Sequence, residues 1–405
     1  MVELAYLARQ VGFTNEASRR VVDDAKPLTG FTIGVTASRR ADEFATFLTR
    51  RGATVIHAPA IRIIPLSDDT ELRRVTRQII DKPPEFVVVT TGIGFRGWME
   101  AAAGWGERNA FKQALASTRL LARGTKAKGA VRAAELCEEW SPVSETMAEV
   151  LDHLVAQGID GKRIAVQLDG APTEGKVVGD LCDLLGCAGA DVTAVPVYRW
   201  MPPEDPAPID RMIDLIATRA LDAVSFTSAP AVGALLARAK VTGTLEPILH
   251  AFRNDVLAAC IGPVTSVPFI ELEVPTTGPE CPRLGELVWH IADELPRRAI
   301  TIQVGGREFS IRGSCVLVDG EVRRLPPAAM TLIRVLGAQP GRVVPREELM
   351  SALPRGGDAH AVEVAVARLR ASLRAPDAVQ TVYKRGYRLA LDPVEYVDMC
   401  RDGTV

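Results

Sequence analysis

The 405-residue sequence lacks the features that mark several common classes of protein. Its seven cysteines are scattered and form no Cys-x-x-Cys pair, which favours reduced thiols in the cytoplasm over disulfides or a metal site. No apolar run is long enough to span a membrane, and the first residues lack the basic-then-apolar pattern of a signal peptide. We therefore expect a cytoplasmic protein that binds no metal and contacts no membrane.

Histidine is also scarce, because the chain has only five and none falls in the polar loops that follow the predicted strands. Nucleophilic catalysis by serine or cysteine needs a neighbouring base, most often histidine. No Ser-His-Asp or Cys-His set is apparent, so the sequence does not indicate this chemistry.

Charge is unevenly distributed along the chain, although the net charge is only −2. Residues 296–390 contain 16 Lys and Arg against 8 Asp and Glu, whereas the remainder contains 32 against 42. A basic C-terminal module is therefore attached to an acidic body, and such a module suits a polyanionic partner.

The stretch 161–201 predicts a strand–helix–strand unit, with strands at 163–168 and 191–200 and a helix that is ended by Gly186 and Gly189. Residues 31–66 repeat this order, and GATVIHAPAIRIIP aligns with GADVTAVPVYRWMP without a gap. Two further pairs of segments extend the duplication, 83–102 with 220–239 and 119–136 with 255–272.

The duplication predicts that residues 30–293 form two similar α/β halves with parallel sheets covered on both faces. Ligands bind such sheets at the carboxyl ends of the strands, where helix N-termini offer free N–H groups. The loops at these positions are rich in Thr, Ser and Gly, with Arg and Lys nearby, and suit an anion with several carboxylates or phosphates. The candidate ligand-binding residues are Thr36, Arg39, Arg40, Thr91, Thr125, Lys126, Ser228 and Thr265.

One loop carries the GxGxxG pattern of a dinucleotide site, from Gly92 through Gly94 to Gly97. Such a site also needs an acidic residue after the next strand, but that strand ends at Arg123. The matching turn of the other half has no glycines, so a plain tight turn is favoured over a nucleotide site.

Three motifs, DAVSFTSAPAV, IGPVT and the crossover ending in VYRW, resemble uroporphyrinogen-III synthase, which cyclises hydroxymethylbilane while inverting its last pyrrole ring. The resemblance covers essentially all of residues 30–293. It implies two doubly wound parallel-sheet domains joined by a two-stranded ladder, with an acidic substrate between them.

The resemblance also implies domain boundaries. The first domain would comprise residues 30–62 plus 202–293, the second residues 63–201, and segments 57–65 and 192–201 would be the connecting strands. Residues 1–29 would be an N-terminal extension, either a docking helix or a poorly ordered terminus.

The family's cleft tyrosine falls on Tyr198, its IGPxT threonine on Thr265 and its F-T-S serine on Ser228, while Thr91 and Thr125 occupy the equivalent turns of the other half. The family needs no cofactor, because it holds the tetrapyrrole folded while a hydroxyl leaves and a spiro intermediate forms. Tyr198 would donate the proton to that hydroxyl. The alternatives are a half-buried linker tyrosine for Tyr198 and helix N-capping for Thr265 and Ser228.

Two turns depart from the family pattern and put catalytic competence in doubt. The first reads Thr36-Ala37-Ser38 instead of Thr-Arg-Pro, with the arginines displaced to positions 39 and 40. The third reads Gly124-Thr125-Lys126, with Gly129 where a helix would be under way.

Residues 296–392 predict a separate module, followed by a tail at 393–405. Segments 299–306 and 309–320 alternate as strands, and a helix follows Leu325-Pro326-Pro327. Residues 359–373 have an apolar helical stripe, and TVYKRGYRLAL closes the module as a hairpin.

This module resembles the winged helix-turn-helix effector domain of OmpR/PhoB-type response regulators, through VDGEVRRLPPAAMTLIRVL, GRVVPREELM, VEVAVARLRASL and TVYKRGYRL. The resemblance implies a recognition helix at 359–374 in the major groove and a wing on the adjacent minor groove or backbone. Arg368 and Val364 would contact bases. The implied phosphate-binding residues are Arg370, Thr381, Lys384 and Arg385.

Two positions depart from this family: Ala365 replaces a frequent polar reader, and Tyr383-Lys384-Arg385 replaces an Arg-Gly pair. The DNA sequence that this module recognises therefore cannot be inferred from other members of the family. Each arginine alone could be a solvated surface charge, but their clustering in a basic module favours binding to double-stranded DNA.

The synthase-like body stands where a response regulator has its receiver domain. One hypothesis is a transcription regulator similar to actinobacterial regulators of nitrate and nitrite assimilation. Its body would sense a tetrapyrrole or other polyanion, or would contact RNA polymerase or another regulator. A dimer on DNA is one arrangement of such a regulator. The alternative is an active, cofactor-free synthase, a cyclising hydro-lyase that also carries a DNA-binding domain. A nucleotide-dependent enzyme is the least favoured.

Overall fold

The computed structural model describes residues 26–66, 70–168, 170, 179–353 and 358–391. Most of the predicted N-terminal extension, most of the loop at 169–175 and the C-terminal tail lie outside these ranges. The chain divides into two compact units, Met1–Ala58 with Ala207–Val405 and Pro59–Pro206. Within the described ranges, no helix combines the length and apolar character that crossing a membrane requires.

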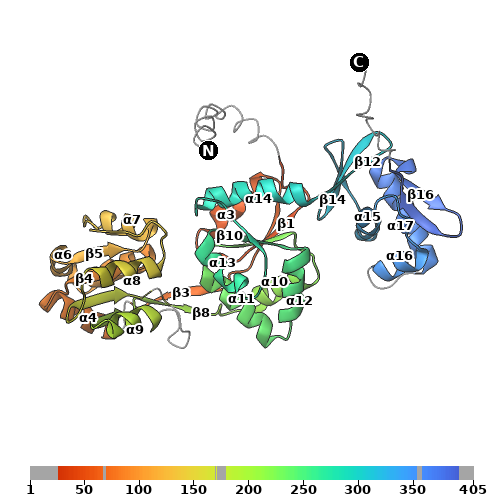
Figure 1. Ribbon diagram of the computed structural model, residues 1–405. Coiled ribbons are helices and arrows are strands. Elements are labelled where there is room, and N and C mark those ends of the chain that lie inside the picture. Colours follow the sequence, from red (N-terminus) through yellow and green to blue (C-terminus); the bar gives the residue numbers. More distant parts are fainter. Residues whose placement is uncertain (1–25, 67–69, 169, 171–178, 354–357, 392–405) are drawn as a thin grey trace, which may run out of the picture. The chain divides into compact units, whose positions relative to one another are not determined.

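The first unit contains a five-stranded parallel sheet with the order β11-β10-β9-β1-β2 (Figure 1). Its strands are β1 (Thr32–Val35), β2 (Thr54–His57), β9 (Ala223–Phe226), β10 (Leu257–Cys260) and β11 (Thr276–Thr277). Its helices are α3 (Ala41–Arg50), α10 (Ala207–Ala217), α11 (Ala229–Val241), α12 (Leu245–Asn254), α13 (Pro263–Ile270) and α14 (Leu284–Arg298). Because β1 pairs with both β2 and β9, the chain leaves this sheet after β2 and returns to it at β9.

The second unit contains a four-stranded parallel sheet with the order β5-β4-β6-β7. Its strands are β4 (Phe86–Val89), β5 (Arg119–Ala122), β6 (Arg163–Gln167) and β7 (Asp191–Val195). Its helices are α4 (Thr70–Asp81), α5 (Gly92–Gly104), α6 (Arg108–Ala116), α7 (Thr125–Ala133), α8 (Met147–Ala156) and α9 (Gly179–Cys187). The prediction that Gly186 and Gly189 end this helix agrees with the structure, since α9 runs to Cys187 and Gly189 takes the left-handed φ of 89°.

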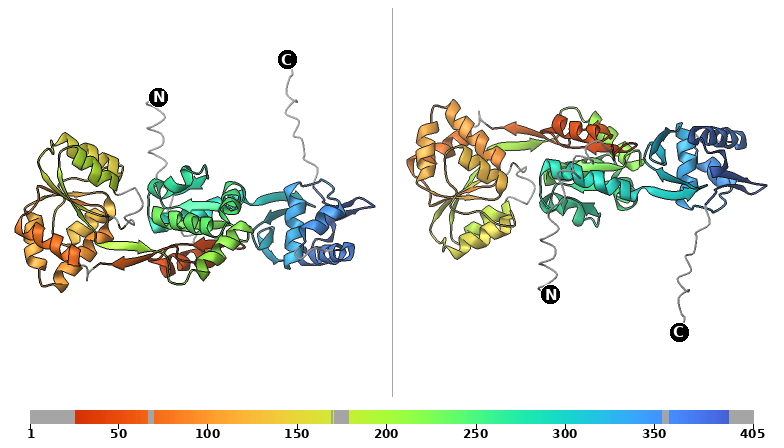
Figure 2. Two further views of the ribbon diagram at one scale, coloured as in Figure 1. Left: turned by 90° about the horizontal axis from the view of Figure 1, so that it is seen from below. Right: turned by 90° about the horizontal axis from the view of Figure 1, so that it is seen from above.

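Helices cover both faces of this second sheet, and the burial pattern explains why (Figure 2). Val87 and Val89 of β4 pack with α4, α5, α6 and α7 in one apolar cluster. Phe86 and Val88 of the same strand pack with α8 and α9 in another. Successive side chains of a strand point to opposite faces, so a continuous apolar run is buried on both. The predicted α/β class with two parallel sheets is confirmed.

A separate antiparallel ladder pairs β3 (Arg62–Pro65) with β8 (Tyr198–Met201). The predicted ladder is present, but the continuous connecting strands at 57–65 and 192–201 were wrong, as was the single strand at 191–200. Each is broken, because Pro196 follows β7 and Pro59 follows β2. Proline has no N–H to donate, so it ends strand pairing at these positions.

The C-terminal domain opens with a four-stranded antiparallel sheet of order β12-β13-β14-β15. Its strands are β12 (Ile300–Val304), β13 (Arg307–Ile311), β14 (Cys315–Val318) and β15 (Glu321–Arg324). The helices α15 (Pro327–Ala338), α16 (Arg346–Ala352) and α17 (Ala359–Leu373), the short 3-10 helix η1 (Pro376–Ala378) and the hairpin of β16 (Val379–Val382) and β17 (Gly386–Leu389) follow. This is the predicted winged helix. The prediction of one strand at 309–320 was wrong, since the chain turns at Gly313 between β13 and β14.

The first α/β sheet and the C-terminal domain meet at a polar contact around Arg312. Its guanidinium donates to the carbonyl oxygens of Pro27 (2.7 Å) and Thr29 (3.1 Å) and lies over the Phe31 ring, 5.2 Å from its centroid. The Ser314 N–H donates to the carbonyl of Gly30 at 2.7 Å. These bonds attach the C-terminal domain to the segment that leads into β1.

Asp222 is a half-buried acid at this contact. Its carboxylate accepts the N–H of Thr32 at 2.7 Å, and a Cβ on Gly313 would lie 2.0 Å from its Oδ2 atom, so a side chain there would displace the carboxylate. Burial raises the pKa of Asp222 to about 6, although the Thr32 hydrogen bond and the charge of Arg334 oppose the shift.

Asp222→Asn should remove a pH dependence of stability. The unfolded chain releases this proton near pH 4 and the folded chain near pH 6, so the folded state holds one more proton in that window. The contribution of Asp222 to wild-type stability should therefore fall by about 2 kcal/mol as the pH rises from about 4 to 6. The asparagine can still accept the Thr32 bond but carries no charge, so thermal unfolding should find the variant more stable at pH 7.5 and not at pH 4. A difference in stability between the variant and the wild type that stays constant across this pH range would contradict the raised pKa of Asp222.

Candidate functional site

In the first unit, the predicted ligand residues after β1 have different surroundings. Thr36 is fully buried, and its hydroxyl donates to the carbonyl of Ser225 at 2.8 Å. Arg39 and Arg40 are exposed, and Arg40 pairs with Glu43 through two bonds of 2.6 Å. Thr36 thus fixes the turn between β1 and α3, while the two arginines present positive charge. Their contact with a ligand stays a prediction.

Ser228 and Thr265 also follow strands of this sheet, at the starts of α11 and α13. Ser228 occupies the N-cap position of α11, but its side chain makes no capping hydrogen bond. Thr265 is buried inside the first turn of α13, whose N-cap is Gly262. The alternative of N-capping is therefore wrong for both side chains, and their binding role stays a prediction.

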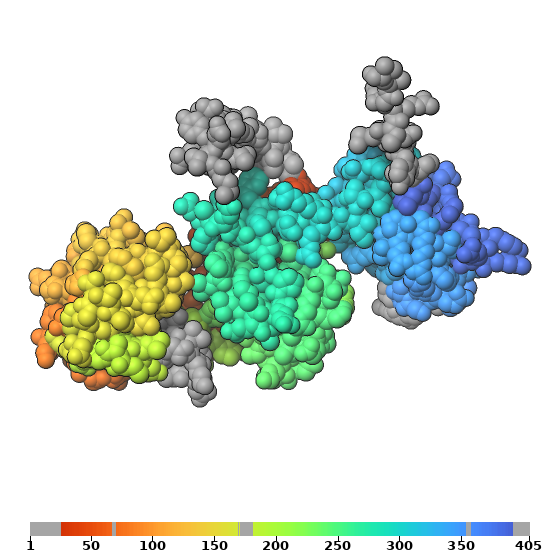
Figure 3. Space-filling model, in the orientation of Figure 1, coloured from red at the N-terminus to blue at the C-terminus, as the bar shows by residue number. Residues whose placement is uncertain are grey.

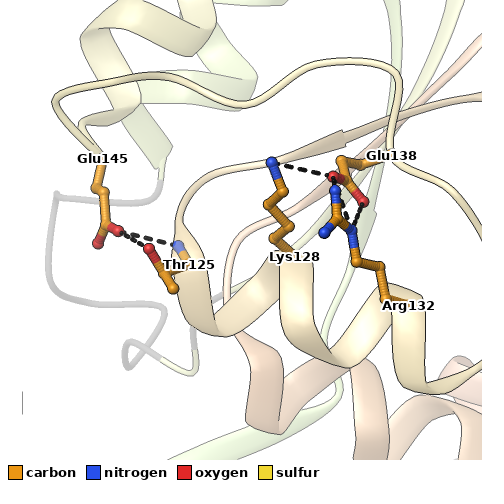
Figure 4. Close-up of polar contacts among 5 residues, drawn as sticks. All are labelled: Thr125, Lys128, Arg132, Glu138 and Glu145. Atoms are coloured by element: carbon orange, nitrogen blue, oxygen red, sulfur yellow. Dashed lines mark hydrogen bonds and ion pairs between the residues drawn. The ribbon is translucent and has the colours of Figure 1, made fainter.

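In the second unit, the start of α7 is occupied by a carboxylate from the same chain (Figure 4). The Glu145 carboxylate accepts the N–H of Thr125 at 2.9 Å and its hydroxyl at 2.7 Å. Although burial alone would raise it, the Thr125 bonds and the charges of Lys126 and Arg123 hold the pKa of Glu145 below its usual value. Sequence reasoning missed Glu145, because it lies 20 residues from Thr125 and carries no local signal.

Two basic residues on the exposed face of α7 form ion pairs with a second acidic residue. Lys128 and Arg132, one turn apart, both pair with Glu138, at 3.2 Å and 2.7 Å (Figure 4). The Glu138 side chain is only 6% exposed, so these charges serve to hold the segment after α7. The helix continues through Gly129.

Thr91 and Tyr198 come together in the second unit, with their hydroxyl oxygens 3.2 Å apart. Tyr198 is buried, its ring lies against Gly170, and a Cβ on Gly170 would meet the ring at 2.3 Å. Gln167, at the end of β6, completes the group: its Nε2 donates to Thr91 Oγ1 at 3.1 Å and its Oε1 accepts from Thr91 N at 3.2 Å. Sequence reasoning missed Gln167, although a polar residue in an apolar strand was a signal.

The GxGxxG pattern has a packing explanation in this structure. A Cβ on Gly92 would lie 2.2 Å from the carbonyl oxygen of Lys126, and one on Gly94 would lie 2.1 Å from Gln167 Nε2. A Cβ on Gly97 would meet Val197 only at 3.6 Å, an ordinary contact. The first two glycines therefore let α5 approach α7 and Gln167 closely, as a tight turn requires.

The recognition helix α17 begins at the predicted residue. Asp358 caps it by accepting the N–H of Ala361 at 2.7 Å. Val362, Val366, Leu369 and Leu373 are buried in the domain core, whereas Arg368 is exposed and Val364 is half-buried. Ala365 is 3% exposed, so this departure from the family lies in the core and does not replace a surface reader.

Two predicted phosphate ligands bond to each other. The Arg370 guanidinium donates to the carbonyl of Val379 (2.9 and 2.6 Å) and to the Thr381 hydroxyl (2.9 Å). Arg370 thereby ties α17 to β16, the first strand of the wing. A phosphate contact by either residue stays a prediction.

The bend of the β16–β17 hairpin projects from the C-terminal domain (Figures 1 and 3). Lys384 adopts a left-handed φ of 57°, and its ammonium lies 5.3 Å from the centroid of the Tyr383 ring. Tyr383, Lys384 and Arg385 are all exposed. The wing thus presents two cations and an aromatic ring, a surface suited to the DNA backbone.

Comparisons with known proteins agree with both parts of the fold. The family model for uroporphyrinogen-III synthase HemD matches residues 42–288, and the model for the C-terminal part of transcriptional regulatory proteins matches residues 320–389. Uncharacterized protein YjjA of Bacillus subtilis (strain 168) is 26% identical over 268 residues, which cover 66% of this chain and 97% of that protein.

Two solved structures illustrate these similarities. A mutant uroporphyrinogen-III synthase of the extremely thermophilic bacterium Thermus thermophilus is 25% identical, with a TM-score of 0.54 over 66% of this chain and 100% of that chain. The DNA-binding domain of Klebsiella pneumoniae RstA, solved in complex with its RstA box, is 28% identical over 22% of this chain and 96% of that chain, with a TM-score of 0.19. Because the first family model matches more than half of the chain and the second matches its C-terminal part, the chain belongs to the uroporphyrinogen-III synthase family and carries a C-terminal DNA-binding domain of the OmpR/PhoB type.

Proposed function

We propose that the protein is a transcription regulator whose synthase-like body binds a tetrapyrrole or a related polycarboxylate and thereby controls DNA binding. The observation that carries this proposal is the contact around Arg312. The C-terminal domain is bonded to the segment that leads into β1, while Arg39 and Arg40 follow the opposite end of β1. A ligand held by these arginines would thus act on the strand that anchors the DNA-binding domain.

The metabolic role is proposed by family analogy. Regulators of similar architecture act in nitrate and nitrite assimilation, and nitrite reductase needs sirohaem, which is made from uroporphyrinogen III. A regulator that senses a tetrapyrrole would match nitrite reductase synthesis to the supply of its cofactor.

The alternative is an active synthase that also binds DNA. The contact between Thr91 and Tyr198 favours it, because a phenol held by a second hydroxyl is suited to proton donation. The departures in the first and third turns favour the regulator.

Uroporphyrin III should change the affinity of the full-length protein for its DNA site by about tenfold, the middle of the usual range for allosteric coupling. The site would first be selected from random duplexes, and affinity then measured by fluorescence anisotropy with and without the porphyrin. Unchanged affinity at saturating porphyrin would exclude this ligand as the signal.

A cyclisation assay separates the two functions. Freshly made hydroxymethylbilane would be supplied to the protein, and the type I and type III uroporphyrin isomers separated after oxidation. We expect type I only, the spontaneous product. Type III above background, reduced several-fold by Tyr198→Phe, would establish the synthase instead.

A further inference from the structure

The direction of the hydrogen bond between Thr91 and Tyr198 follows from the groups around it. A hydroxyl oxygen has two acceptor sites and one hydrogen to donate. Thr91 Oγ1 already accepts the N–H of Gly94 at 3.2 Å and the Nε2–H of Gln167 at 3.1 Å. Both acceptor sites are filled, so the Thr91 hydroxyl donates its hydrogen to the Tyr198 oxygen, 3.2 Å away.

The backbone fixes which end of the Gln167 amide faces Thr91. Gln167 Oε1 lies 3.2 Å from the Thr91 nitrogen, which can only donate, and Nε2 lies 2.6 Å from the Leu168 carbonyl oxygen, which can only accept. Exchanging the two ends would set donor against donor and acceptor against acceptor. The side chain is fully buried, so no solvent molecule relieves such a mismatch.

We infer that Gln167 is a positioning residue that makes Tyr198 a hydrogen-bond donor. Because the Tyr198 oxygen accepts from Thr91, its own hydrogen is directed to a different acceptor. A donor of this kind suits the carboxylate or hydroxyl oxygens of a tetrapyrrole. The inference rests on the proposed function in that the ligand would contact Tyr198, but the hydrogen-bond direction itself does not depend on the ligand.

A double-mutant cycle tests the coupling, with uroporphyrin III affinity as the first measurement. Gln167→Met keeps the side-chain length and removes both polar atoms. We expect it to weaken uroporphyrin binding about fivefold in the wild type and less than about twofold in Tyr198→Phe, because both changes remove the same donor. Gln113→Met, at an exposed position of α6, is the matched control and should leave affinity unchanged. Effects of Gln167→Met that are equal in both backgrounds would overturn the inference.

Raman difference spectra provide a readout independent of binding. Subtracting the Tyr198→Phe spectrum from the wild type isolates one of five tyrosines, and the tyrosine ring doublet reports whether the phenol oxygen accepts. Thr91→Val should abolish the accepting signature and Gln167→Met should weaken it. An identical Tyr198 spectrum in all three proteins would overturn the assigned direction. Should Tyr198→Phe leave porphyrin binding unchanged while the spectra change as expected, the proposed ligand site fails and the role of Gln167 stands.

Discussion

Gly386→Ala should destabilise the C-terminal domain by about 3 kcal/mol, the largest effect expected of any change considered for this protein. Gly386 opens β17 with a φ of 137°, a conformation that residues with a Cβ rarely adopt. A Cβ there would lie 2.0 Å from the carbonyl oxygen of Val344. That oxygen also accepts the N–H of Tyr387 at 3.1 Å, so relieving the collision would break the pairing of the wing with the segment before α16.

The destabilisation would appear as a lower midpoint of the thermal transition that belongs to this domain, together with weaker DNA binding. Gly285→Ala is the control, because Gly285 lies inside α14 and a Cβ there would meet nothing within 4 Å. Helix propensity predicts that this second change stabilises by about 0.5–1 kcal/mol. Equal midpoints for Gly386→Ala and the wild type would show that the wing can separate from Val344 without any loss of stability.

Arg368→Ala should weaken binding to the specific DNA site by about 30-fold and relax the preference at one base pair. Arg368 is exposed on α17, outside the buried stripe of Val362, Val366 and Leu369. No hydrogen bond or ion pair of the described residues involves its guanidinium, so the change should leave the fold intact. The preference would be measured on a set of duplexes in which each base pair of the site is varied in turn.

Arg307→Ala provides the matched loss of one positive charge. Arg307 is exposed at the start of β13, in the sheet that opens the domain, and it bonds weakly to the Arg374 carbonyl at 3.5 Å. We expect a change below about threefold, since Arg307 contacts the C-terminal end of α17 and its charge would act on DNA through the screened field of the domain. If Arg368→Ala weakens all sequences equally, Arg368 contacts phosphate and another residue reads the base.

The sequence by itself predicted the α/β class and the two parallel sheets, whereas the ladder and the winged helix were implied by its resemblance to two families. The α/β class and the parallel sheets depend on local signals: apolar runs of strand length, amphipathic helices, and turn residues at regular spacing. Motifs such as VEVAVARLRASL add the placement of the recognition helix, because an apolar stripe at helical spacing leaves Arg368 on the outer face. The breaks at Pro59 and Pro196 could also have been predicted, since proline ends strand pairing. They were missed because the apolar residues on both sides of each proline resemble one continuous strand.

Only the tertiary structure decided how the polar side chains at the strand ends are used. Thr36 proved to be buried, Glu145 to occupy the start of α7, and Gln167 to bond to Thr91. Thr91 lies 76 residues from Gln167 and 107 from Tyr198, so no local pattern links them. They meet because parallel strands bring their carboxyl ends to one edge of a sheet. Burial then forces each polar atom to find a partner there, which sets the direction of every hydrogen bond in the group.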